Sequence, residues 1–73
     1  MHKANSLRAL FARSLTRRRK HLGLTLAQAA ARAKFSTSYL AMLESGARSP
    51  SLETVGHVAR ALGFGHPREM FRG

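Results

Sequence analysis

The stretch TLAQAAARAKFSTSYLAMLESG, residues 25–46, predicts two short helices separated by a turn of only a few residues. The first helix opens with a capping box, in which the Thr25 hydroxyl and the Gln28 side chain each satisfy a backbone amide. One face of this helix then carries only small side chains, at Ala29, Ala30 and Ala33. We expect a neighbouring helix to pack closely against that face.

The second helix of the pair has Ser36 as its N-cap and ends at Gly46. Leu40 and Leu43 share the face that points inward. The other faces carry a mixed set of side chains: Thr37, Ser38, Tyr39, Ala41 and Met42. Two helices of this kind describe a helix-turn-helix over residues 25–45, in which the exposed start of the second helix can enter a major groove of DNA.

Further helices are predicted on both sides of this pair. The preceding helix begins after Asn5 or Ser6 and ends at Gly23, with one apolar stripe formed by Leu7, Phe11, Leu15 and Leu22. The following helix is capped by Ser51 and ends before Gly63, with apolar residues at Leu52, Val55, Val58 or Ala59, and Leu62. A last short turn of helix can start at Pro67.

The apolar composition favours helices over strands. Ile is absent and Val occurs only at positions 55 and 58, whereas Leu and Ala dominate. We therefore expect an all-α fold, a compact bundle of about five helices that forms a single domain over residues 1–73. Residues 1–5 are expected to be a flexible arm.

The charge of the chain restricts its partners. Thirteen Lys and Arg against three Glu give a net charge of +10 over 73 residues, and residues 1–34 hold nine of the basic residues and no acid. The expected partner is a polyanion, such as nucleic acid or an acidic membrane surface. Cys is absent, which excludes disulfides and fits a reducing cytoplasm.

The sequence resembles the Cro and lambda-repressor (Xre) family of helix-turn-helix proteins across residues 15–63. The resemblance is carried by an ordered set of residues: Gly23-Leu24-Thr25, Ala30, Phe35-Ser36, Leu40, Leu43-Glu44-Ser45-Gly46, Arg48, Pro50-Ser51, Thr54 and Ala59-Arg60-Ala61-Leu62-Gly63. It implies a sequence-specific regulator of transcription, a repressor, whose recognition helix is residues 37–45. It also implies an ion pair between Arg19 and Glu44; the alternative is a solvated Arg19 and a Glu44 that only caps a helix end.

The resemblance further implies two kinds of contact to double-stranded DNA. The expected base readers are Thr37, Ser38, Tyr39, Ala41 and Met42. For Tyr39, partial burial or a contact from its hydroxyl to a phosphate is the alternative. The expected phosphate contacts are the amides of Leu26 and Ala27, with Lys34, Arg48, Arg17 and Arg18. Lys3 and Arg8 are expected in an arm that follows the groove. Because the reading face has no Arg, Asn or Gln, apolar contacts, single hydrogen bonds, water and DNA shape must share the discrimination.

Three residues depart from the family pattern. Leu26 stands where the family has Gln, so the contact to phosphate is reduced to the backbone amide. Lys34 stands where Gly adopts a left-handed turn, which predicts a looser turn. Ala29 replaces a Leu and leaves core volume for Leu26 or Phe35 to fill.

We expect a homodimer on an inverted repeat with half-sites about 10 base pairs apart. Residues 64–73 are the expected dimerisation segment, because large apolar groups in and beside it lack obvious intramolecular partners: Leu62, Phe64, Met70 and Phe71.

Other function classes fit the sequence less well. The scattered Glu residues, the absence of Asp and the spacing of His2, His21, His57 and His66 favour neither an enzyme nor a metal site, and no cofactor is expected. The longest uncharged, apolar-rich run, residues 22–31, is too short to span a bilayer and contains Thr25 and Gln28. Two alternatives stay open: an antitoxin or controller with a protein partner, and a non-specific basic nucleic-acid-binding module. The expected location is the cytoplasm of a bacterium or a phage-infected cell, on the nucleoid.

Overall fold

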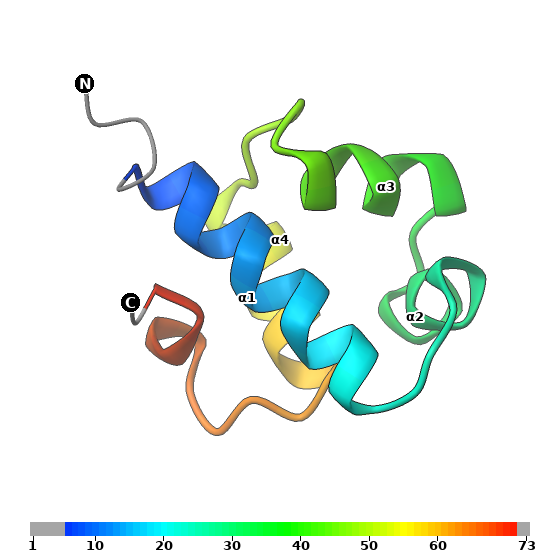
Figure 1. The fold of residues 1–73 in the computed structure, drawn as a ribbon. Coiled ribbons are helices and arrows are strands. Elements are labelled where there is room, and N and C mark those ends of the chain that lie inside the picture. The colour runs from blue at the N-terminus through cyan, green and yellow to red at the C-terminus, as the bar shows by residue number, and fades with distance from the viewer. Residues whose placement is uncertain (1–5, 72–73) are drawn as a thin grey trace.

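The computed structural model describes residues 6–71, apart from the side chain of Pro67 (Figure 1). The predicted arm, residues 1–5 with Lys3, lies outside the described residues, as do residues 72–73 of the predicted dimerisation segment. Four α-helices and one short 3-10 helix follow one another along the chain: α1 (Leu7–His21), α2 (Leu26–Ala33), α3 (Thr37–Ser45), α4 (Leu52–Ala61) and η2 (Pro67–Phe71). Residues 6–71 contain no strand, so the all-helical prediction is confirmed.

Each α-helix begins at a Ser or Thr whose hydroxyl accepts a hydrogen bond from a backbone amide of the first turn. These N-caps are Ser6, Thr25, Ser36 and Ser51. At Thr25 the capping box is complete, because the Thr25 amide also donates to Gln28 Oε1 at 2.8 Å. An N-cap of this kind contributes about 1 kcal/mol. The predicted helix starts therefore rest on interactions between residues only three apart.

The turn between α2 and α3 contains a residue in the left-handed conformation, although that residue is Lys34 and not glycine. Lys34 has φ 61° and ψ 40°. Among residues 6–71 it is the only residue other than glycine with a positive φ. The Phe35 amide donates to the Ala30 carbonyl at 2.9 Å, so the turn is closed rather than loose. The expectation of a looser turn is wrong. A left-handed residue other than glycine costs only on the order of 1 kcal/mol, and the packing of α2 against α3 and α4 offsets that cost.

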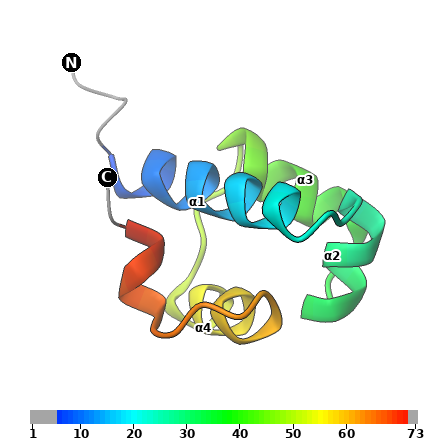
Figure 2. The ribbon, with the colours of Figure 1, turned by 60° about the horizontal axis from the view of Figure 1, so that its bottom comes forward.

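The hydrophobic core lies where α1 crosses the other helices. Its fully buried large side chains are Phe11, Leu15, Leu40, Leu43, Val58 and Met70. α1 packs against α3 and η2, and α2 packs against α3 and α4. Figure 2 shows α4 and η2 on one side of α1, with α3 on the other. Ala29 and Ala30 of α2 are 1 % exposed, and the half-buried Leu26 and Phe35 pack against the same core.

The C-terminal residues complete this core, which corrects part of the predicted dimer interface. Leu62 is 2 % exposed and Met70 is fully buried. Phe71 stacks on Phe11 with ring centroids 6.2 Å apart, and Ser14 Oγ donates to the Met70 carbonyl at 2.5 Å. Leu62 and Met70 are therefore buried by residues of the same chain and offer no surface to a partner. The 3-10 helix η2 packs against α1 and so places Met70 in the core.

We expect Ala30→Leu to destabilise the fold by about 1–3 kcal/mol, because three extra carbons must enter a closely packed helix face. Ala31→Leu is the matched control, since Ala31 is exposed one residue further along the same helix and the change there stays within about 0.5 kcal/mol. Denaturant unfolding of the two variants measures the difference. Equal stabilities would show that α2 does not pack as described.

Candidate nucleic-acid interface

α3 has a buried side and an exposed side. Leu40 and Leu43 are fully buried and hold α3 against the core. Thr37 and Ser38 are exposed in its first turn, and Ala41 and Met42 are half-buried one turn later. These four of the five expected base readers thus lie on accessible faces of the helix. Ser45, which is not one of the expected base readers, is also exposed, although its hydroxyl donates to the Met42 carbonyl at 3.1 Å.

Tyr39, the fifth expected base reader, lies differently. Its hydroxyl is 3.2 Å from Thr54 Oγ1 in the first turn of α4, and its ring meets Phe35 edge-on with centroids 5.0 Å apart. Thr54 is buried and also receives a hydrogen bond from Ser51 Oγ. The side chain of Tyr39 is therefore turned toward α4 and joins α3 to it, so base reading by Tyr39 is not supported.

Arg48 lies beside Tyr39 in the loop that follows α3. Its guanidinium carbon is 5.6 Å from the centre of the Tyr39 ring, and its side chain is exposed. The loop is held to the end of α3, because the amides of Ala47 and Arg48 both donate to the Met42 carbonyl. A cation held over an aromatic ring is partly preorganised but keeps its charge and outward donors. Arg48 can therefore bind a phosphate next to α3.

Arg19 and Glu44 form a bidentate ion pair between the end of α1 and the end of α3. Arg19 Nε is 2.7 Å from Glu44 Oε2 and Nη2 is 3.0 Å from Oε1, while Nη1 donates to the Leu24 carbonyl at 3.0 Å. The two side chains are only 14 % and 10 % exposed. The hydrogen bonds that Arg19 donates to Glu44 raise the pKa of Arg19 above its ordinary value, and burial opposes this. The pair fixes α3 and the start of α2 relative to α1.

Arg18, an expected phosphate contact, binds groups of the protein itself. Its Nε donates to the Leu62 carbonyl at 2.8 Å and its Nη2 to the Gly63 carbonyl at 3.1 Å. Its guanidinium also lies over Phe64, 5.6 Å from the ring centre. Arg18 thus caps the C-terminus of α4, where carbonyls lack helical partners and a cation is favoured. The structure therefore gives Arg18 a role within the fold, and its guanidinium is not held ready for a phosphate as the sequence led us to expect.

The other expected phosphate ligands are accessible. Leu26 and Ala27 are the first two residues of α2, where backbone amides have no carbonyl in a preceding turn. Lys34 is exposed in the turn, and Arg17 is exposed on α1. Arg8 is exposed too, but belongs to the first turn of α1, where its Nη1 donates to Ser49 Oγ at 3.4 Å. It therefore does not lie in the predicted arm.

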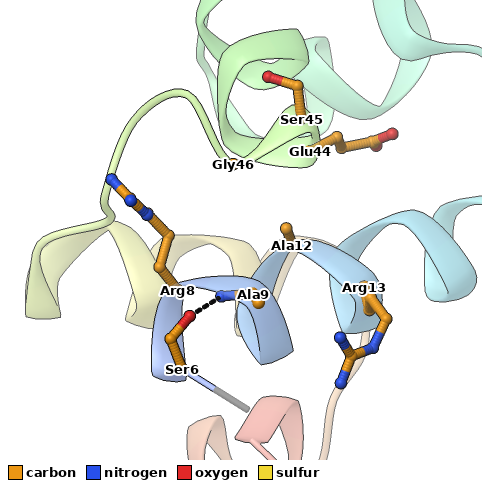
Figure 3. A pocket seen from close by; sticks show the side chains of 8 residues that line it. All are labelled: Ser6, Arg8, Ala9, Ala12, Arg13, Glu44, Ser45 and Gly46. Atoms are coloured by element: carbon orange, nitrogen blue, oxygen red, sulfur yellow. Dashed lines mark hydrogen bonds between the residues drawn. The ribbon is translucent and has the colours of Figure 1, made fainter. Parts of the chain in front are cut away.

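A groove of about 480 Å³ lies between α1 and the C-terminal end of α3 (Figure 3). Ala9 and Ala12 line its α1 side, and Glu44, Ser45 and Gly46 line the other. The side chains of Arg8 and Arg13 point in different directions rather than converging on a common point (Figure 3). Because Glu44 is already bound by Arg19, this groove does not present the convergent polar groups of a small-molecule site.

Residues 6–71 show no cluster of three or more His, Cys, Asp or Glu side chains arranged to hold a metal ion. None of the helices described has the combination of length and apolar character that crossing a membrane requires.

Comparisons with known proteins agree with this geometry. A family model described as a helix-turn-helix domain matches residues 10–70. The chain is also 40 % identical over 60 residues to an uncharacterized HTH-type transcriptional regulator of Sinorhizobium fredii. The aligned stretch covers 82 % of this chain and 78 % of the relative. No solved structure matches the chain significantly.

We expect Glu44→Ala to lower the free energy of unfolding by about 3 kcal/mol, because Arg19 then remains largely buried without its carboxylate. The double variant Arg19→Met with Glu44→Leu is expected to regain most of that loss, since it removes both charges and keeps the volume. Glu53→Ala, at an exposed carboxylate, is the control. Thermal and denaturant unfolding test this. A Glu44→Ala variant as stable as the control would contradict a structural role for the pair.

Proposed function

The chain belongs to the helix-turn-helix family of DNA-binding transcriptional regulators, and from that premise we propose that it is a repressor that binds an inverted-repeat operator as a homodimer. Occupying a promoter is sufficient to exclude a polymerase, so repression needs no activity beyond binding. The chain contributes no chemical step in this proposal, and it acts on the nucleoid in the cytoplasm.

The observation that carries the proposal is the exposed first turn of α3 on a strongly basic chain. Thr37 and Ser38 have no role in the core, while Leu40 and Leu43 fix the helix from its other side. A helix whose first turn is free and whose rear face is rigid can enter a major groove without rearrangement. The net charge of +10 supplies affinity for the phosphate backbone around that groove.

We assign base reading on this surface to Thr37, Ser38, Ala41 and Met42. Thr and Ser hydroxyls make single hydrogen bonds to base edges, and Ala41 and Met42 offer apolar contacts to thymine methyl groups. None of the four makes the bidentate contacts that discriminate most strongly. We therefore propose that DNA shape and bridging water carry part of the specificity.

Phosphate binding is assigned to groups that flank α3. Arg48 follows it and Lys34 precedes it, and the amides of Leu26 and Ala27 open α2. Arg17 is a further candidate on α1. Tyr39 supports this set without touching a base, because it holds Arg48 on one side and Thr54 on the other.

The experiment that tests the function is selection of bound duplexes from a random library in about 0.15 M salt with competitor DNA, which suppresses non-specific phosphate binding. We expect an enriched inverted repeat whose half-sites lie about 10 base pairs apart. Enrichment of no motif, with tight binding confined to low salt, would contradict a sequence-specific repressor. It would support a non-specific nucleic-acid-binding module instead.

Variants of the two contact classes should behave differently on the selected duplex. We expect Arg48→Ala to weaken binding to all sequences alike and to reduce the slope of log K against log salt by about one. Ser38→Ala removes one base contact and should cost about 1 kcal/mol on the selected site, with little loss on unrelated DNA. Fluorescence anisotropy titrations at several salt concentrations separate the two effects. A change of preference in Arg48→Ala, or a uniform loss in Ser38→Ala, would reverse the assignment.

A further inference from the structure

Two exposed leucines lie together at one end of the molecule. Leu52 is 92 % exposed and Leu7 is 68 % exposed, although both are large and apolar. They line the same groove, of about 280 Å³, together with Pro50 and Phe71. We call these four residues the end patch. The DNA interface proposed above uses none of them.

The end patch joins elements that are distant in sequence. The start of α1, the start of α4 and the end of η2 each contribute to this groove. All three segments lie at the end of the molecule away from α2 (Figures 1 and 2). The loop of residues 46–51, which carries Arg48, leads from the C-terminal end of α3 to Leu52. The patch is therefore connected to the proposed DNA surface through a loop of few residues.

We infer that the end patch is the contact to a second copy of this chain, formed when two copies bind one duplex. The inference rests on the proposed function and names the surface that the homodimer uses. A two-fold dimer brings the same surface of each copy together, so this surface must be complementary to itself. The charges beside the end patch are of both signs, as that condition requires.

Arg8 and Glu53 supply the complementary charges. Arg8 lines the groove on the α1 side, and Glu53 follows Leu52 in the first turn of α4; both are exposed. A two-fold axis through the patch lets Arg8 of each copy approach Glu53 of the other, while the leucines meet between them. DNA phosphates would be repelled by Glu53 and would leave the leucines in water. An acidic protein would be attracted to Arg8 but repelled by Glu53.

The size of the patch and the charge of the chain predict when this contact forms. A stable protein interface buries about 800 Å² on each partner, which four side chains with their neighbours do not reach. Two free copies also repel each other, since each carries a net charge of +10. Bound DNA neutralises this charge and holds the copies side by side. The free chain is therefore monomeric at ordinary concentrations, and pairing appears as cooperativity on DNA.

The first measurement is an NMR dilution series of the free chain from about 2 mM to about 0.05 mM, in about 0.5 M salt to screen the charge repulsion. We expect concentration-dependent shifts at Leu7, Leu52 and Phe71, and their loss in Leu52→Ser. Ala31→Ser, an exposed position on α2 at the other end of the bundle, should retain them. Shifts that are absent, or that lie elsewhere on the surface, would overturn the inference. This measurement needs no operator, so it is decisive even if no DNA motif is selected.

The second measurement compares a duplex containing two selected half-sites with one containing a single half-site. We expect the second copy to bind about tenfold more tightly than the first, and Leu52→Ser to abolish this factor without changing affinity for the single half-site. Ala31→Ser should keep the factor. Equal binding of the first and second copies of the unmodified chain would overturn the inference while leaving sequence-specific DNA binding intact.

A charge exchange distinguishes a second copy from any other partner. Arg8→Glu alone and Glu53→Arg alone should each reduce the cooperativity factor, because each places like charges across the two-fold axis. The double variant should restore the factor to within about twofold of the unmodified chain. Failure of the double variant to recover, with both single variants folded, would place a different molecule on the end patch.

Discussion

The bidentate pair between Arg19 and Glu44 is the interaction on which the presentation of α3 depends. It links the last turn of α1 to the last turn of α3, and the same guanidinium holds the Leu24 carbonyl just before α2. A planar fork that makes three hydrogen bonds restrains direction as well as distance. Since the alanine face of α2 contributes little volume, this polar restraint supplements a small core in fixing the helix-turn-helix.

A second restraint acts at the other end of α3. Tyr39 joins the first turn of α3 to Thr54 of α4 and is packed edge-on by Phe35. α3 is thus held from both ends, through α1 and through α4, while Thr37 and Ser38 on its outer side are exposed. Preorganisation of this kind removes an ordering cost from binding, which would favour the base reading that we propose for α3 without bidentate side chains.

Some of the basic residues of α1 serve the structure itself. In the run Arg17-Arg18-Arg19, Arg18 caps α4 and Arg19 pairs with Glu44, and Arg17 is exposed. Net charge therefore overstates the number of cations available to phosphate. The C-terminal turn contributes in the same way, because Met70 fills the core and leaves Phe71 at the edge of the end patch.

The sequence by itself determined the helices, their caps and the helix-turn-helix, since these depend on interactions within about four residues. The start at Thr25 and the ends at Gly46 and Gly63 are of this kind. Only the tertiary structure decided the partners of Arg18, Tyr39 and Met70, whose contacts join residues 44, 15 and 56 positions apart. Charge, aromaticity and apolar character show what a side chain can bind, but the packing of the helices decides which group comes within reach. For that reason Arg18, expected on DNA, binds the carbonyls at the end of α4, and Met70, expected at a dimer contact, lies in the core.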